Sequence, residues 1–374
     1  MEEMMLNWHS PIWDPSGYAY VGRHILKELL KKGVKIGLDE YFQWNPSLRN
    51  LAKYGGESLH RQLQKTRYEG SPNIELVIPD AFKYYSQGKR IGYTMFEVDR
   101  ISDIWALLCN KMDEVFVPSH FNYETFKSSG VKEEKLKVMP FGVDVDLFKP
   151  DVEPFELLGP KKNDFIFFSD YQHSIRKGWD VLLRAFCHEF KAEENVCLVL
   201  KTYEAIPNDP RSEVKIMREM YSVKSEFDTT PRIYWYKPMV RDQDLPRLYK
   251  CADAFISTSR GEGFNLPLIQ CMAMGIPTIA TGWSGHMEYA NKNNCFLIDY
   301  ELVKTHEEML WHPGYAGAFY AEPDLGKTRE LMRYVFENPE NAKEVGIKAM
   351  NEIREKYTWE KAADRIVERV FHGV

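Results

Sequence analysis

The sequence predicts an α/β protein of two domains, each an open parallel sheet with helices on both faces. Short apolar runs alternate with amphipathic helical patterns along almost the whole chain, which is typical of strands joined by crossover helices. The chain has 374 residues, which is too long for one ordinary core. The alternation also stops once and then restarts, so we expect two sheets rather than one.

The composition is that of a globular protein, with 44% hydrophobic and 28% charged residues. A net charge of -6 and the absence of a dense Lys/Arg run disfavour a nucleic-acid partner. The six cysteines form no C-x-x-C pair and no zinc spacing, so we expect reduced thiols and a cytoplasmic protein. No stretch approaches the ~20 apolar residues of a membrane span, and the first six residues do not resemble a signal peptide.

In the first half of the chain, a helical stripe follows Gly17 and ends at Gly33. Residues 121–128 predict another helix. Strands are expected at 34–38, 74–78, 91–95, 115–118 and 137–141. Residues 142–164 then break the alternation with prolines, glycines and charges, which indicates an interdomain linker.

The second half restarts the same rhythm. Strands are expected at 165–168, 196–201, 233–236, 254–258 and 277–281. Helices are expected at 179–190, 213–227, 245–251 and 266–274, and the chain from residue 325 onward is largely helical. Parallel sheets of this kind bind ligands beyond the carboxyl ends of their strands, so two such crevices are expected.

The most informative segment runs from residue 257 to 279 and reads STSRGEGFNLPLIQCMAMGIPTI. A buried strand enters a glycine-rich turn, and a helix follows with Pro267 in its first turn, where proline is tolerated. The start of such a helix offers an anion backbone N–H groups, here those of Phe264, Asn265 and Leu266. Glu262 comes just before these donors, and Gln270 lies two turns further along the helix.

A second polar segment begins at Ser174 and opens the expected helix at 179–190. Arg176 and Lys177 lie at its N-terminal end, where the helix dipole disfavours cations unless an anion is bound. The alternative is a solvated basic pair. Arginine offers a planar fork and lysine a point charge, a combination suited to two phosphate groups.

These segments resemble glycosyltransferase family 4, retaining enzymes with the GT-B fold, in which two Rossmann-like domains face a central cleft. The family motif reads roughly S-x-x-E-G-F-G-L-P-x-x-E-A-M-A-x-G-x-P-V. The residues that match it are Ser259, Glu262, Gly263, Phe264, Leu266, Pro267, Met272, Ala273, Gly275 and Pro277. The resemblance implies that Glu262 holds hydroxyls of the donor sugar. It also implies that the amides of Gly263, Phe264, Asn265 and Leu266 hold the diphosphate.

Two departures from the family pattern stand out. The second glutamate of the motif, which grips the nucleotide ribose in the family, is Gln270 here. An amide still forms hydrogen bonds with a hydroxyl, but it carries no charge. The family also places its phosphate-binding arginine earlier in the loop, where this chain has Asp170, so Arg176 is interpreted as a displaced substitute beside Lys177.

Weaker matches extend over nearly the full length. Gly17 lies in a segment that resembles the first strand–helix loop of the family and is a donor-binding candidate, with a plain turn as the alternative. Glu97 follows a strand and is a candidate contact for the reacting sugar, with a solvated loop residue as the alternative. Tyr203 can stack on the nucleotide base or serve as an ordinary aromatic contact. The resemblance implies a first domain of residues 1–145, completed by the last helix at about 358–374, and a second of residues 146–357.

The overall prediction is a retaining, metal-independent glycosyltransferase that uses a nucleotide-diphosphate sugar as donor and needs no cofactor. Its acceptor is a carbohydrate, a lipid-linked compound, a protein or a small molecule. Asp144 and Asp146 form a D-x-D pattern, but they lie in the linker, so no metal site is expected. The alternatives are a nucleotide-sugar epimerase of the same architecture and a non-catalytic protein that binds nucleotide sugars or carbohydrates.

Overall fold

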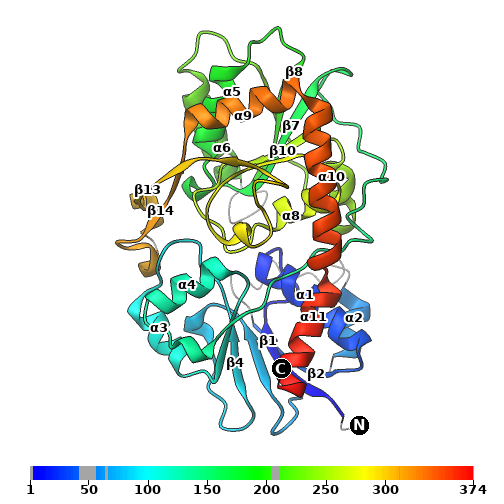
Figure 1. Ribbon diagram of the computed structural model, residues 1–374, viewed down its shortest axis with the longest axis vertical. Helices are drawn as coiled ribbons and strands as arrows, with labels where there is room; N and C mark the ends of the chain where they lie inside the picture. The colour runs from blue at the N-terminus through cyan, green and yellow to red at the C-terminus, as the bar shows by residue number, and fades with distance from the viewer. Residues whose placement is uncertain (1–2, 42–55, 64–65, 204–209, 311, 374) are drawn as a thin grey trace. The chain divides into compact units, whose positions relative to one another are not determined.

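The computed structural model describes residues 3–41, 56–63, 66–203, 210–310 and 312–373 (Figure 1). The chain divides into two compact units, one formed by residues 1–142 with 356–374 and the other by residues 143–355. Each unit contains a six-stranded sheet in which all neighbouring strands are parallel. The predicted α/β class with two parallel sheets is therefore confirmed.

The sheet of the first unit has the strand order β2-β1-β3-β4-β5-β6. Its strands are β1 (Met5–Ser10), β2 (Lys35–Glu40), β3 (Asn73–Leu76), β4 (Arg90–Tyr93), β5 (Glu114–Val117) and β6 (Leu136–Val138). The helices of this unit are α1 (Gly17–Lys31), α2 (Gly56–Gln62), α3 (Asp103–Asn110), α4 (His120–Ser128) and α11 (Trp359–Val367). β1 lies between β2 and β3. The chain therefore adds β2 on one side of β1 and all later strands on the other side.

α1 begins where the sequence predicts it. The side chain of Ser16 accepts a hydrogen bond from the backbone N–H of Ala19, which caps the first turn. The apolar stripe is buried, including Val21 and Ile25. The helix ends before Gly33, whose φ of +81° lies in the left-handed region that favours glycine.

The end of the chain belongs to the first unit, because α11 packs against α1 (Figure 1). Trp359 stacks on His24 of α1, with ring centroids 5.2 Å apart and an interplanar angle of 15°. Thr358 caps α11 by accepting a hydrogen bond from the backbone N–H of Lys361. The first unit therefore contains segments from both ends of the sequence.

The sheet of the second unit has the strand order β12-β11-β10-β7-β8-β9. Its strands are β7 (Phe165–Gln172), β8 (Val196–Tyr203), β9 (Arg232–Trp235), β10 (Ala254–Ser257), β11 (Thr278–Thr281) and β12 (Phe296–Ile298). A separate antiparallel ribbon is formed by β13 (Tyr300–Lys304) and β14 (Phe319–Pro323). The helices are α5 (Trp179–Glu189), α6 (Pro210–Lys224), α7 (Leu245–Tyr249), α8 (Leu266–Ala273), α9 (Leu325–Glu337) and α10 (Pro339–Lys356).

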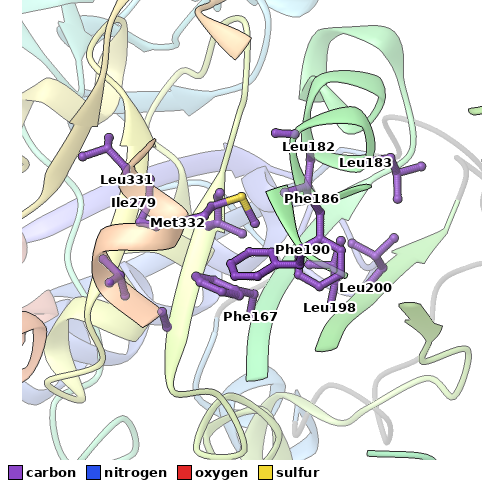
Figure 2. Close-up of a cluster of buried hydrophobic side chains, with 14 of the residues drawn as sticks. Phe167, Leu182, Leu183, Phe186, Phe190, Leu198, Leu200, Ile279, Leu331 and Met332 are labelled. Carbon is purple, nitrogen blue, oxygen red and sulfur yellow. The ribbon is translucent and has the colours of Figure 1, made fainter. Parts of the chain in front are cut away.

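The core of the second unit lies between its sheet and the helices α5 and α9. Figure 2 shows Phe167 of β7 beside Phe186 of α5 and Phe190, which directly follows α5, with Met332 of α9 nearby. These side chains are at most 3% exposed. Full burial of each contributes roughly 1.5–3 kcal/mol relative to exposure, so this cluster fixes the sheet that carries the site described below.

Several parts of the structure differ from the expectation, and α2 and β12 are among the elements that the sequence does not predict. The sequence does not predict α3. Its residues Ile104 and Leu107 are apolar but 63% and 65% exposed, so its apolar residues do not form one buried stripe with helical spacing. The ribbon of β13 and β14 was not predicted. Residues 143–164 pack on the second unit: for example, the backbone N–H of Phe155 donates to the carbonyl of Arg247.

Candidate active site

The candidate site of the second unit lies beyond the carboxyl ends of two neighbouring strands, β7 and β10, which pair in parallel. After β7, a single 3₁₀ turn at Ile175–Lys177 carries the two predicted cations. After β10, the glycine-rich loop carries Glu262. Because neighbouring parallel strands end at the same edge of a sheet, these two loops meet there.

The two cations and the carboxylate come together. Nζ of Lys177 donates to Oε1 of Glu262 at 2.6 Å, and Nη1 of Arg176 lies 3.3 Å from Oε2 of the same carboxylate. Nη1 of Arg176 also donates to the carbonyl of Gly261 at 2.6 Å. All three side chains are at most 16% exposed. The cluster keeps one net positive charge, since two cations face one carboxylate.

The ionisation of Glu262 follows from these neighbours. Burial by itself would raise the pKa of this carboxyl group, but the charges of Lys177 and Arg176 outweigh burial and lower the pKa to about 2. At neutral pH the side chain is therefore a carboxylate, which only accepts hydrogen bonds. A group with these properties is suited to accept hydrogen bonds from sugar hydroxyls.

Close backbone contact fixes the turn that carries the cations. Gly178 follows Lys177 with φ of +63°, and a Cβ atom there would lie 1.9 Å from the carbonyl oxygen of Thr258. The hydroxyl of Thr258 donates to the carbonyl of Gly178 at 2.9 Å. The sequence predicts the two cations at the start of α5. The structure places them in the preceding turn, because this left-handed glycine separates the turn from the helix.

Arg260 connects the parts of the site, although the sequence argument assigned it no role. Its guanidinium donates to the carboxylates of Asp180 and Glu322 at 2.6–3.0 Å and to the carbonyl of Ile175. Its backbone N–H donates to the carbonyl of Arg176 at 2.7 Å. Arg260 is 4% exposed, and it holds the cation-bearing turn against the loop of Glu262. The sequence alone could not indicate this role, because the family motif allows any residue at the position of Arg260.

A second loop that the sequence argument missed supports the backbone of Glu262. The N–H of Glu262 donates to Oγ of Ser284 at 2.9 Å, and the N–H of Gly285 donates to the carbonyl of Glu262 at 2.9 Å. A Cβ atom on Gly285 would lie 1.9 Å from the carbonyl oxygen of Gly263. The pair Ser284-Gly285 is a turn signal, but it names no partner, so only the fold reveals this contact.

The predicted helix start is present as the first turn of α8, and anion binding there stays a prediction. Asn265 precedes α8 with φ of +62° and provides no side-chain cap, because its Nδ2 donates to Oγ of Ser257 instead. The hydroxyl of Tyr289 lies within hydrogen-bond distance of the carbonyls of Phe264 and Asn265, at 2.8 and 2.7 Å. The carbonyls of this turn are thus held by protein, while the amide end of α8 keeps the partial positive charge of a helix start.

The remaining candidates of the second unit are also placed. Gln270 is on α8 and 4% exposed. Tyr203 ends β8, and the ammonium of Lys201 lies 5.2 Å from its ring centroid. Asp170 is bound to Lys201 at 3.2 Å and to the hydroxyl of Tyr249 at 2.7 Å, which gives it a structural role in β7. Base binding by Tyr203 and ribose binding by Gln270 stay predictions.

Gly17 and Glu97 belong to the first unit. Gly17 is the exposed first residue of α1, and a Cβ atom there would meet nothing within 4 Å. Glu97 is half-buried and follows β4. Burial is the main cause that raises the pKa of the Tyr18 hydroxyl, and the nearby charge of Glu97 raises it further. Their contribution to the site around Glu262 stays a prediction.

The D-x-D pattern forms a local turn in which Oδ1 of Asp144 accepts hydrogen bonds from the backbone N–H groups of Asp146 and Leu147 at 3.2 and 3.0 Å. Among the described residues, no group of three or more His, Cys, Asp or Glu side chains could hold a metal ion. In the same part of the chain, none of the helices is both long and apolar enough to cross a membrane.

Residues 162–309 match the family model described as "Glycosyl transferases group 1". The chain is 25% identical over 155 residues to mannosylfructose-phosphate synthase of Agrobacterium fabrum, which covers 41% of this chain and 34% of that protein. It is 27% identical over 178 residues to alpha-monoglucosyldiacylglycerol synthase of Streptococcus pneumoniae. This match covers 46% of this chain and 38% of that protein. The matches thus span little more than a third of the length of these two relatives.

Solved structures resemble the chain over nearly its full length. Anabaena HepE in complex with UDP and glucose superposes with a TM-score of 0.68 at 15% identity, covering 98% of each chain. Sucrose-phosphate synthase of Thermosynechococcus elongatus gives 0.67 at 14% identity, covering 99% of this chain and 100% of that one. At such identities these likenesses show the fold alone, which is the predicted GT-B fold of two Rossmann-like domains.

Proposed function

We propose that this chain is a retaining, metal-independent glycosyltransferase of family 4, which transfers a hexosyl group from a nucleotide-diphosphate sugar to a hydroxyl group of an acceptor. The proposal is supported by the match of residues 162–309 to glycosyl transferases group 1. It is carried by one observation, the convergence of Arg176 and Lys177 on the buried carboxylate of Glu262 beside the start of α8.

The charges of the cluster suit a sugar diphosphate. The net positive charge left after pairing, together with the amide end of α8, attracts the diphosphate, while the carboxylate of Glu262 accepts hydrogen bonds from the sugar. Negative charge grows on the diphosphate as the bond to the sugar breaks. Cations that are held in place beforehand by Arg260 and Gly178 stabilise this charge without rearranging during the reaction.

The proposed reaction balances without a metal ion or another cofactor. The bond between the anomeric carbon and the diphosphate oxygen breaks, and a bond forms between that carbon and the acceptor oxygen. The acceptor proton passes to an oxygen of the departing phosphate, on the same face of the sugar, so the anomeric configuration is retained. Arg176 and Lys177 fill the role of neutralising the leaving group that a metal ion has in other enzymes.

A thermal-shift screen against UDP-glucose, GDP-mannose and ADP-glucose tests donor binding. A ligand at one hundred times its Kd stabilises the folded protein by about 2.7 kcal/mol, which raises the midpoint of unfolding. Glu262→Gln should abolish most of this shift, whereas Glu69→Gln, an exposed change in the first unit, should keep it. No shift with any nucleotide sugar would contradict the proposal.

Products then separate the proposal from its alternatives. Incubation of the shifting donor with a panel of sugars, in buffer with EDTA, should yield a glycoside of unchanged anomeric configuration by NMR. Conversion of the donor to its epimer without an acceptor would indicate an epimerase. Donor binding without any product, in the presence of every acceptor tried, would indicate a non-catalytic binding protein.

A further inference from the structure

The sheet of the first unit has a switch point that the function proposed above does not use. β2 and β3 lie on opposite sides of β1, and the later strands continue outward from β3. Connections from β1 and from β3 therefore leave the sheet in opposite directions. In open parallel sheets, this arrangement opens a crevice beyond the carboxyl ends of the two strands, and ligands bind there.

Three titratable residues form a row across this switch point. His9 on β1 is the register partner of Asp39 on β2 and of Glu75 on β3. Register partners of parallel strands point to the same face of a sheet. Each of the three is the penultimate residue of its strand, so the row lies at the carboxyl edge. His9 is 3% exposed and Glu75 is fully buried.

The tautomer of His9 follows from its surroundings. Nδ1 lies 2.9 Å from the carbonyl oxygen of Asp39, which only accepts hydrogen bonds, so Nδ1 carries the proton. Burial and the charge of Lys83 lower the pKa of His9, which keeps the ring neutral. Nε2 therefore presents a lone pair, and this buried atom has no hydrogen-bond partner within the described ranges.

Glu75 also has a buried oxygen atom without a hydrogen-bond partner among the described residues. Its Oε2 accepts a hydrogen bond from the backbone N–H of Lys83 at 2.5 Å, but its Oε1 is buried and unpartnered with respect to the described residues. A buried acceptor left in this state destabilises the folded protein unless a ligand or water satisfies it. Nη1 of Arg67 is likewise buried without a partner there, while its guanidinium carbon lies 3.1 Å from the ring centroid of Tyr85.

The other charges of the cluster are satisfied. The carboxylate of Asp39 accepts hydrogen bonds from Nζ of Lys83 at 2.5 Å and from the hydroxyl of Tyr85 at 2.9 Å. The unsatisfied groups are thus Nε2 of His9, which accepts a hydrogen bond, Oε1 of Glu75, which accepts one when the carboxyl group is ionised, and Nη1 of Arg67, which donates one. They are complementary to a ligand that donates two hydrogen bonds and accepts one.

The chemistry of the cluster narrows the class of ligand. An anion would face the lone pair of His9 and the carboxyl group of Glu75. An organic cation would face Arg67 and Lys83, and these charges also disfavour a metal ion. A neutral compound with several hydroxyl groups meets all three groups, because each hydroxyl both donates and accepts.

We propose that His9, Glu75 and Arg67 form a subsite for a neutral polyhydroxylated ligand, with hydroxyl groups donating to His9 Nε2 and Glu75 Oε1 and accepting from Arg67 Nη1. On the glycosyltransferase function proposed above, on which this identification rests, the ligand is the acceptor sugar. The subsite then selects the acceptor, while the residues around Glu262 bind the donor.

Crystals of the full chain soaked with D-glucose, D-mannose or D-fructose test the subsite directly. We expect at least one soak to place sugar oxygens about 2.7–3.2 Å from His9 Nε2 and Glu75 Oε1. Ordered water alone on these atoms in all three soaks would overturn the proposal. This measurement needs no variant and no transfer activity, so it decides the subsite even if no nucleotide sugar binds.

Kinetics provide the second test once a transfer reaction is found. His9→Asn keeps a donor for the carbonyl of Asp39 but removes the Nε2 acceptor, and Glu75→Gln keeps the shape of the side chain. Each should raise KM for the acceptor sugar about tenfold, as expected for one lost hydrogen bond to a polar ligand, and leave the donor-induced thermal shift unchanged.

The matched controls are the exposed His188→Asn and Glu69→Gln. An unchanged KM for the acceptor in both variants would contradict the subsite. If no nucleotide sugar shifts the unfolding midpoint of the wild-type protein, only the proposed donor function is contradicted.

Discussion

Two buried carboxyl groups, one in each unit, differ in almost everything except burial. Glu262 is 6% exposed and its pKa is lowered to about 2, whereas Glu75 is fully buried and its pKa is raised to about 7. Burial raises both pKa values. It is outweighed at Glu262 by two cations in direct contact, but at Glu75 a backbone amide and the charges of Lys83 and Arg67 only reduce its effect. The partners of a buried acid therefore decide its charge at neutral pH.

The largest effect that tests this contrast is expected from Arg260→Leu. The change removes the group that holds the turn of Arg176 against the loop of Glu262. It also takes an ion-pair partner from Glu322 and from Asp180, which keeps its pair with Arg184. Breaking a buried ion pair from one side costs about 3–5 kcal/mol of the free energy of unfolding, which urea titration measures. Arg241→Leu breaks an exposed pair with Asp244 and should cost less than about 1 kcal/mol. Equal losses in the two variants would contradict the role of Arg260.

Lys177→Ala should have the next largest effect. Removal of one preorganised cation from the leaving group is expected to lower kcat by roughly 10²–10³, or about 3–4 kcal/mol. It should also move the pKa of Glu262 upward, toward its ordinary value, because the Lys177 charge is the largest influence that lowers it. Single-turnover transfer rates measure the first effect. Lys162→Ala removes an exposed lysine and should leave the rate unchanged.

Glu75→Gln tests the other side of the comparison through pH. A group whose pKa is raised on folding contributes stability that is present at low pH and lost as pH rises through the folded-state value. Relative to the variant, the wild-type protein should lose at most about 3 kcal/mol between about pH 4.5 and pH 7. Urea unfolding at pH 5 and pH 8 measures this difference, and the exposed Glu69→Gln should show none. A wild-type protein that loses stability relative to the variant as pH falls would contradict this prediction.

The smallest effect is expected from Gln270→Glu, which restores the glutamate of the family motif. If the side chain contacts the nucleotide ribose, the carboxylate should strengthen that hydrogen bond by about 1 kcal/mol and lower the donor Kd about fivefold. Isothermal titration with the donor measures the change, with the exposed Gln243→Glu as control. A weaker donor affinity would show that the buried amide is adapted to this chain.

The sequence predicts the fold and the candidate site of the second unit because both are encoded locally. The alternation of strands and helices follows from periodicity, and the residues from Ser259 to Gln270 are contiguous. The contacts of Arg260 with Glu322 and of Glu262 with Ser284 could not be predicted, since they join separate loops. The same holds for the row of His9, Asp39 and Glu75, which exists only through the register of three strands.

The packing of α11 against α1 has a consequence for protein synthesis. Chains emerge from the ribosome with the amino terminus first, and domains generally fold as units. The first unit contains Trp359, which stacks on His24, so its helical layer cannot close until the whole second unit has been translated. During elongation, the surface of α1 that later receives α11 is therefore left uncovered by its native partner until the last residues have been added.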